Sequence, residues 1–334
     1  MCWNDVVFCP DGVVNGLTAN KVVDALAGEN KIFPVGLKEV FLTRYEKMRE
    51  HFLDSCVKNP DFWNQSNGLR LANTRKTEGK RQYKDALLEI PASYQAFHGN
   101  AEWKGILKNP CVGHDMPVWM HGPNPRKNRR VMIVSQDPLR KGHHVGKLLL
   151  STPFGYHSAA YRGNGFMMRL ALCLMEEGCT LYFTDYRKIY SGPKDKMKPV
   201  DDCHCTGCPY MEECLAKFDE YNRSKNALNQ RFAPLYHDCL IREVRLFKPT
   251  AVLLLGGAVS QLAANKFQFD AAVGGVELVK DGLPRMTYLG SPTIDKVTYR
   301  FYTTCHPTGT HLSLEGVEKL AYYRTSIINA LTQE

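Results

Sequence analysis

The chain has 334 residues, of which 44% are hydrophobic and 23% charged, enough to bury a full core as one large domain with an appendage or as two domains. No apolar run approaches the roughly 20 residues that span a bilayer, and the N-terminus lacks a signal-peptide pattern, so we expect a cytoplasmic protein without a membrane partner. The net charge of +9 favours a polyanion such as nucleic acid without identifying it, and twelve cysteines in such a chain indicate metal before disulfides.

Residues 1–110 predict a helical N-terminal extension. An amphipathic helix is expected over 37–57, and residues 59–85 are polar and basic with scattered aromatic side chains. A basic stretch of this kind is more often a solvated face than a nucleic-acid site. We therefore expect the function to reside in residues 111–334.

Short apolar runs alternate with amphipathic segments in residues 111–334. The expected strands cover 130–136, 180–185, 250–257 and 299–307, and helical spacing is found over 165–178 and 239–249. This alternation predicts a three-layer α/β/α sandwich with a central, mostly parallel four-stranded sheet. Reactive groups of such folds lie at the carboxyl ends of the strands, where Asp137, Asp185 and His306 stand.

Five motifs follow one another along these predicted elements. They are "VWMHGPNPRKNRRVMIVSQDP" (118–138), "STPFGYHSAAYRGNG" (151–165), "YFTDYRKIYSGPKD" (182–195), "FKPTAVLLLGGAV" (247–259) and "TTCHPTGTHLS" (303–313). In this order they resemble the uracil-DNA glycosylase superfamily over roughly residues 111–325. Most are similar to its iron–sulfur branch, whereas the Gln-Asp-Pro tripeptide that ends the first motif has the form of the classical branch.

The resemblance implies a monofunctional DNA glycosylase, a monomer that hydrolyses the N-glycosidic bond of a pyrimidine flipped out of double-stranded DNA and leaves an abasic site. Such cleavage requires negative charge near the sugar and hydrogen-bond donors near the departing base. By resemblance, Asp137 positions the water and stabilises the sugar cation, and His306 donates to the base. An Asp that caps the next segment and a core His would explain either residue alone, but their joint placement favours catalysis.

The resemblance also implies a base pocket that contains Gln136, Leu139, Phe154 and Asp185. A flipped base is usually held by stacking against an aromatic ring. Here Phe154 is the expected ring; if the alignment follows the classical branch, Leu150 occupies the aromatic position instead. Asp185 stands where the family has the Asn that reads uracil. A carboxylate accepts from the N4 amino group of cytosine but cannot donate to O4 of uracil. The sequence therefore predicts a cytosine derivative, unless Asp185 only turns the chain after its strand.

Leu139 replaces a Tyr that excludes 5-substituted pyrimidines in the classical branch, and a basic loop follows it. The loop could hold a polar 5-substituent, as in the glucosylated hydroxymethylcytosine of some phage DNA, or could only contact phosphates. A glycosylase that attacks such DNA in defence is known in the superfamily. The expected DNA-contacting residues are Lys141, His143, Pro307, Thr308, Gly309 and Thr310. The alternatives are a uracil-DNA glycosylase of base excision repair and a non-catalytic protein that binds modified DNA on the same fold.

An inserted loop over residues 200–216 is rich in cysteine. Its thiols, Cys203, Cys205, Cys208 and Cys214, suffice for one tetrahedral zinc or one 4Fe–4S cluster. Cys111 and Cys239 match two ligand positions of the iron–sulfur branch and could be borrowed, and His114 could replace a third. Either metal would be structural, because the chemical step needs no cofactor.

Overall fold

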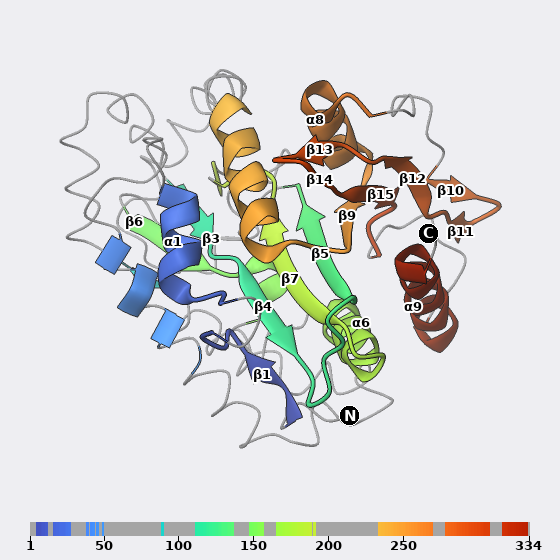
Figure 1. The fold of residues 1–334 in the computed structure, drawn as a ribbon, viewed down its shortest axis with the longest axis horizontal. Coiled ribbons are helices and arrows are strands. Elements are labelled where there is room, and N and C mark those ends of the chain that lie inside the picture. Colours follow the sequence, from blue (N-terminus) through green and yellow to red (C-terminus); the bar gives the residue numbers. More distant parts are fainter. Residues whose placement is uncertain are drawn as a thin grey trace, which may run out of the picture.

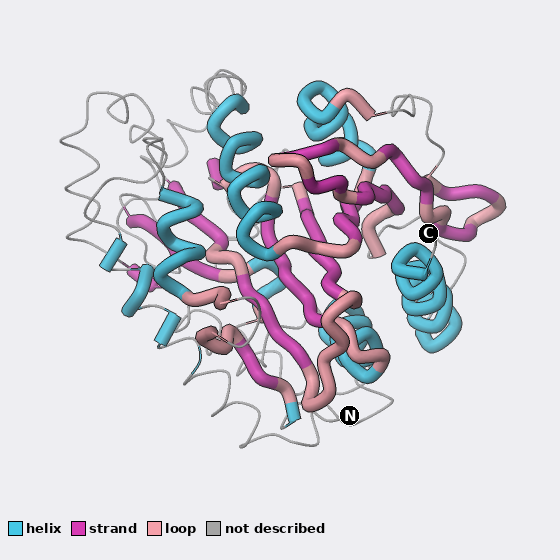
Figure 2. The backbone as a smooth tube through the Cα atoms, in the orientation of Figure 1, coloured by secondary structure: helices cyan, strands magenta, loops and turns pink. Residues whose placement is uncertain are grey.

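The computed structural model describes residues 5–12, 16–27, 88–89, 111–136, 147–156, 165–188, 190–191, 233–269, 278–307 and 316–332, together with parts of 38–49. Strands form a layer between helices in this part of the chain, as the tube drawing shows (Figure 2). No helix within it is long and apolar enough to cross a membrane.

A seven-stranded sheet forms the centre of the described residues, in the order β1-β4-β7-β5-β9-β15-β12 (Figure 1). Its strands are β1 (Val7–Phe8), β4 (Val118–His121), β5 (Arg130–Ser135), β7 (Thr180–Asp185), β9 (Ala251–Leu255), β12 (Thr287–Gly290) and β15 (Arg300–Thr304). The neighbours β7, β5, β9 and β15 are parallel, and the outer strands pair antiparallel. The four predicted strands are thus confirmed as the parallel centre of a sheet that is larger than predicted.

Burial explains why these runs became strands. Every residue of β7 and of β9 is buried, as expected for parallel strands that are covered on both faces. Edge strand β12 is instead only partly buried, and its Tyr288 is exposed. The central strands therefore carry continuous apolar sequences, while the edge strand does not.

Helices pack against both faces of the sheet. They are α1 (Ala19–Ala27), α6 (Gly165–Glu176), a helix over 233–247, α8 (Gly257–Phe267) and α9 (Gly316–Thr332). On one face, the Tyr182 hydroxyl reaches Glu243 of the helix over 233–247 at 3.1 Å. On the other face, the hydroxyl of Tyr302 donates to the Ala330 carbonyl of α9 at 3.1 Å. This arrangement is compatible with an α/β/α sandwich.

The described part of residues 1–110 contributes to the same core. It contains α1 and helical residues within 38–49, and it also supplies edge strand β1 of the central sheet; the predicted helical extension as a whole stays a prediction. The Trp119 indole donates to the Pro10 carbonyl at 3.0 Å, and the Tyr45 hydroxyl donates to the Pro117 carbonyl at 2.7 Å. These contacts bind the N-terminal residues to β4 and its flanks.

Smaller sheets complete the described fold. One has the order β2-β6-β3-β8, and two hairpins pair β10 with β11 and β13 with β14. Their bounds are β2 (Leu88–Glu89), β3 (Cys111–Asp115), β6 (Lys147–Ser151), β8 (Tyr190–Ser191), β10 (Val279–Lys280), β11 (Leu283–Pro284), β13 (Thr293–Ile294) and β14 (Val297–Thr298). A 3-10 turn, η2 (Pro153–Gly155), follows β6 and leads toward the central sheet.

Candidate active site

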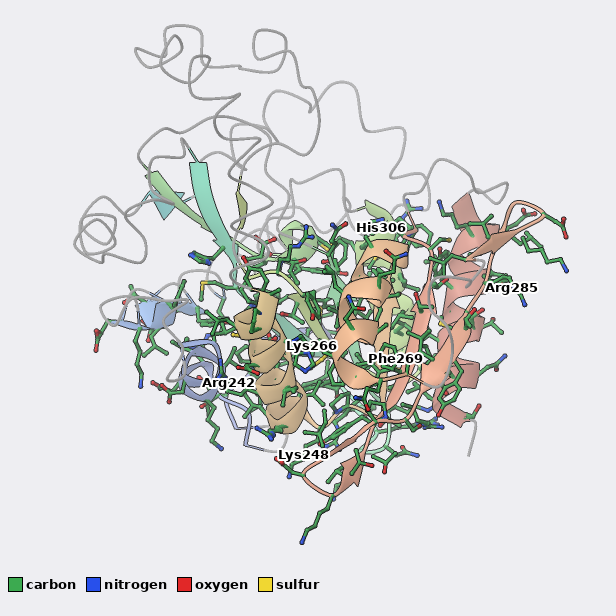
Figure 3. The ribbon with its side chains drawn as sticks, turned by 90° about the horizontal axis from the view of Figure 1, so that it is seen from above. Arg242, Lys248, Lys266, Phe269, Arg285 and His306 are labelled. Atoms are coloured by element: carbon green, nitrogen blue, oxygen red, sulfur yellow. The ribbon has the colours of Figure 1, made fainter. Side chains whose placement is uncertain are left out.

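The carboxyl ends of the parallel strands lie side by side. Ser135 at the end of β5 pairs with Asp185 at the end of β7, and Leu255 of β9 pairs with Thr304 of β15. His306 follows β15 by two residues, and in Figure 3 it lies far from Lys248, which precedes the amino end of β9. The fold thus brings two of the predicted site residues, Asp185 and His306, to one edge of the sheet.

Phe154 lies against His306 at this edge. Their ring centroids are 5.8 Å apart, with an angle of 36° between the ring planes. Phe154 also meets Phe183 of β7 edge-on at 6.0 Å and Tyr156 at 6.1 Å. Both Phe154 and His306 are half-buried, so part of each residue remains accessible to solvent. The predicted stacking ring and the predicted donor to the base are therefore neighbours.

The backbone of Phe154 has an unusual conformation. Its φ of 57° and ψ of 10° lie in the left-handed region, which a bulky aromatic residue rarely adopts. Such a conformation costs about 1–3 kcal/mol and persists only where the surroundings enforce it, often at a functional site. The turn around Phe154 thus holds the ring on Phe183 and beside His306 against a local preference.

Asp185 is tied to the neighbouring strand. The hydroxyl of Ser135 donates to its Oδ1, and the amide of Tyr186 donates to the Ser135 carbonyl at 2.8 Å. Because side chains alternate along a strand, Asp185 lies on the same face of β7 as Phe183 and hence on the side of Phe154. Only 2% of Asp185 is exposed. The residue therefore has a structural role that joins β5 to β7, and its reading of a base stays a prediction.

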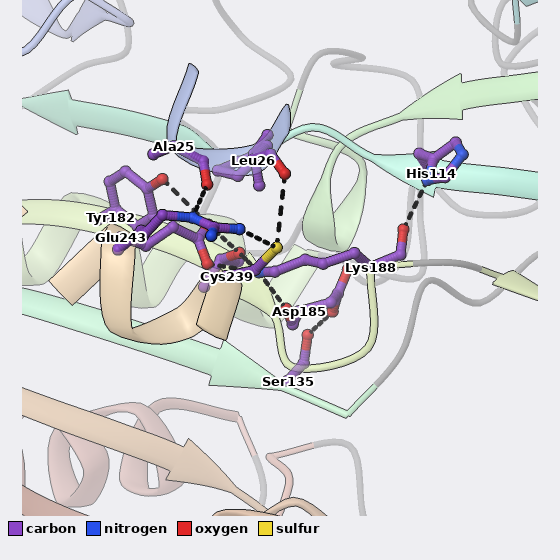
Figure 4. A network of polar contacts seen from close by, with 12 residues as sticks. Ala25, Leu26, His114, Ser135, Tyr182, Asp185, Lys188, Cys239 and Glu243 are labelled. Atoms are coloured by element: carbon purple, nitrogen blue, oxygen red, sulfur yellow. Dashed lines mark hydrogen bonds and ion pairs between the residues drawn. The ribbon is translucent and has the colours of Figure 1, made fainter. Parts of the chain in front are cut away.

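A buried ion pair lies behind Asp185, on the opposite face of β7 (Figure 4). Lys188 Nζ donates to Glu243 Oε2 at 2.5 Å, to Thr184 Oγ1 at 2.6 Å and to the Asp185 carbonyl at 2.5 Å. Glu243 Oε1 also accepts from Thr184 at 2.7 Å and from Tyr182 at 3.1 Å. The pair thereby fixes the turn that follows Asp185 at the end of β7.

Sequence reasoning did not find Lys188 and Glu243. Glu243 does carry a local signal, because it is a charged residue on the buried face of its helix, beside Leu240 and Val244 and one turn before Phe247. Its partner is 55 positions away and has no such signal. A charged residue at an apolar position of a helix predicts a buried partner of opposite charge, but it does not identify that partner.

The remaining predicted residues fall into two groups. Gln136 directly follows β5, and its carbonyl accepts from the Arg187 amide at 3.0 Å, while Pro307 is buried directly after His306. The others lie outside the described residues, as does the side chain of Leu150. They are Asp137, Leu139, Lys141, His143, Thr308, Gly309, Thr310, Cys203, Cys205, Cys208 and Cys214.

One further predicted metal ligand, Cys239, lies among the described residues. The Cys239 thiol donates to the Leu26 carbonyl at 3.5 Å, and burial raises its pKa to about 11. A metal ligand is a thiolate, and a bound metal would itself lower this pKa, so the borrowing of Cys239 as a ligand stays a prediction. His114 is buried and donates from Nδ1 to the Lys188 carbonyl at 2.8 Å, and the side chain of Cys111 lies outside the described residues.

The residues predicted to hold a metal are mainly those of the cysteine-rich loop, with Cys111 and Cys239 as candidate further ligands. Within the described ranges, no three His, Cys, Asp or Glu side chains gather in a way that could bind an ion. The loop itself lies outside these ranges, so its ligand set rests on the sequence.

The chain matches no protein-family model and no curated protein. The resemblance to the glycosylase superfamily therefore rests on the five sequence motifs and stays a prediction.

Proposed function

We propose that the protein is a monofunctional DNA glycosylase that acts on a cytosine derivative flipped out of double-stranded DNA. One observation carries the proposal: the Phe154 ring lies 5.8 Å from the His306 ring, at the edge of the sheet where β5 ends at Ser135, two residues before Asp137 in the sequence. A stacking ring beside a hydrogen-bond donor is the arrangement that a flipped base requires. The five motifs, in their order along the chain, support the same reaction.

In the proposed reaction, the bond between the sugar C1′ and the base nitrogen breaks. Negative charge then develops on the departing base, and a donor at His306 stabilises it, while Phe154 holds the base by stacking. Water adds to the cationic sugar and loses a proton, which Asp137 accepts as a general base. The base anion then takes up a proton from solvent, and Asp137 returns its proton to solvent, so the products are a neutral free base and an abasic site. No metal takes part in the step.

An abasic-site assay on four DNAs tests the proposed function. Duplexes that contain uracil, cytosine, hydroxymethylcytosine or glucosylated hydroxymethylcytosine are incubated with the protein and scored for abasic sites. Excision of a modified cytosine supports the proposal and a defence role against phage DNA. Preference for uracil would indicate a repair enzyme instead. Binding without cleavage of any of the four would indicate a non-catalytic protein that recognises modified DNA.

Asp185→Asn should move the base preference from the cytosine derivative toward uracil. An amide can donate to O4 of uracil, whereas a carboxylate pairs with the N4 amino group of cytosine. A mismatched polar group in a desolvated pocket costs about 1–3 kcal/mol, which corresponds to roughly 5- to 150-fold in rate. The fold should survive because the amide oxygen still accepts from Ser135. The measurement is the excision rate of parent and variant on the four DNAs.

Leu139→Tyr is the companion variant, because it restores the ring that excludes large 5-substituents. It should slow excision of the glucosylated base and spare unsubstituted bases. If the parent prefers uracil and Asp185→Asn changes nothing, the assignment of the substrate to cytosine derivatives is wrong.

We further propose that the loop from Cys203 to Cys214 binds a structural metal. The purified protein should contain either stoichiometric zinc or an iron–sulfur cluster. A zinc protein would be colourless, whereas an iron–sulfur protein would be brown and absorb at about 400 nm. Changing Cys205 and Cys208 to Ser should lower the bound metal, measured by elemental analysis. Cys173→Ser, at a half-buried thiol of α6, is the matched control. Unchanged metal in the double variant would remove the loop from the site.

A further inference from the structure

Helix α9 contacts the segment that carries His306. Tyr323 of α9 is buried, and its hydroxyl donates to the Cys305 carbonyl at 2.9 Å. The hydroxyl proton is used in that bond, so the Cys305 thiol donates to the Tyr323 oxygen at 3.1 Å. Cys305 directly precedes His306. Two hydrogen bonds, one to its carbonyl and one from its thiol, therefore hold Cys305 in place one residue before the proposed donor to the base.

This fixed point lies just beyond the end of the sheet. Strand β15 ends at Thr304, whose carbonyl accepts from the Gly256 amide at 2.7 Å. The next backbone carbonyl, that of Cys305, is held by α9 through Tyr323 instead of by a neighbouring strand. Phe166 of α6 packs edge-on against the Tyr323 ring at 5.7 Å, so the tyrosine is itself held in place.

The hydroxyl of Tyr323 also stays protonated near neutral pH, and it therefore remains a hydrogen-bond donor. Burial, together with the neighbouring Cys305, raises the pKa of the Tyr323 hydroxyl well above its usual value. The bond to the Cys305 carbonyl therefore does not depend on pH near neutrality.

We propose that Tyr323 is a positioning residue for His306. Its bonds to Cys305 set the direction in which the chain leaves β15, and thereby hold the imidazole beside the Phe154 ring, where the departing base would be bound. The catalytic part of this inference rests on the proposed function. The positioning itself concerns the free protein and can be tested without a substrate.

Tyr302 provides a matched control in the same interface. It is a buried tyrosine of β15 whose hydroxyl donates to a backbone carbonyl of α9, that of Ala330, at 3.1 Å. Its own backbone lies inside the strand, between β9 and β12. Tyr302→Phe and Tyr323→Phe each remove one buried hydroxyl between β15 or its extension and α9. Only the second removes a bond next to His306.

The first experiment compares excision by the parent, Tyr323→Phe and Tyr302→Phe on the DNA that the parent cleaves. Tyr323→Phe should lower the single-turnover rate about tenfold or more, because small misplacements of a reacting group are costly. The Kd for DNA should stay unchanged, and Tyr302→Phe should stay within about twofold of the parent. Both variants should lose thermal stability to a similar extent, so stability cannot explain a difference in rate.

The second experiment uses NMR of ¹³C-histidine-labelled protein, with the His306 signal assigned from a His306→Gln variant. Tyr323→Phe should shift or broaden the His306 imidazole signal in the free protein, and Tyr302→Phe should leave it in place. If the parent cleaves none of the DNAs, the proposed function fails while this comparison still decides on positioning. Equal behaviour of the two Phe variants in the NMR spectra would overturn the inference.

Discussion

Asp137→Asn should lower the rate of base excision by about 100- to 10,000-fold, the usual contribution of a general base. The substitution removes the charge that stabilises the sugar cation and the group that accepts the proton of water, but it changes the side-chain volume little. DNA binding and thermal stability should therefore stay close to those of the parent. Single-turnover excision and the Kd for DNA, measured on the same preparations, separate the two effects.

Asp281→Asn is the matched control for this loss of charge. Asp281 is an exposed residue in the turn between β10 and β11, and its φ of 54° is one that Asn adopts readily. The control should cleave at the rate of the parent. If Asp137→Asn also cleaves at that rate, Asp137 is not the catalytic carboxylate.

Lys188→Met should lower the free energy of unfolding by about 3–5 kcal/mol, because it leaves the carboxylate of Glu243 buried without its cation. Lys188 and Glu243 are 1% and 0% exposed, and their charged atoms are 2.5 Å apart. Methionine keeps most of the length of the side chain, so the loss would come from the charge and its hydrogen bonds. Urea denaturation of parent and variant measures the difference.

Two controls test whether burial of the ion pair causes the expected loss of stability in Lys188→Met. Arg245 and Asp295 form a pair of similar length, 2.6 Å, but are 47% and 61% exposed, so Arg245→Met should cost less than about 1 kcal/mol. The double variant Lys188→Met with Glu243→Gln removes both charges and keeps an acceptor for Thr184 and Tyr182. It should recover part of the lost stability. A Lys188→Met protein as stable as the parent would show that the pair adds no net stability.

The central part of the fold could be predicted from the sequence because its strands are buried on both faces. Continuous apolar runs such as β7 and β9, each followed by polar residues or glycine, are typical of parallel strands. The outer strands lack this pattern. Strand β1 has two residues, and β12 mixes buried with exposed positions, so neither shows a periodicity that identifies it. Their pairing depends on contacts between segments that are distant in sequence.

The site could be predicted only where a motif marked it. Phe154 and His306 belong to the Pro-Phe-Gly and His-Pro motifs, and the fold places them in contact. Tyr323 lies beside a second tyrosine in its helix and has no local feature that marks it as the partner of Cys305. Side chains that position a site residue without contacting the ligand are determined by packing in three dimensions. Their spacing along the chain does not reveal them.

The attachment of helix α1 has a consequence for the order of folding. Its last turn is bound by Cys239, which donates to the Leu26 carbonyl, and by Arg242, which donates to the Ala25 carbonyl, over separations of 213 and 217 positions. Contacts between such distant residues require closure of long loops, which slows folding. At a synthesis rate of about 5–20 residues per second, α1 is made roughly 10 to 40 s before these partners. During that interval the last turn of α1 lacks these two native partners, and a chaperone that binds α1 would have most effect on the yield of native protein in this period.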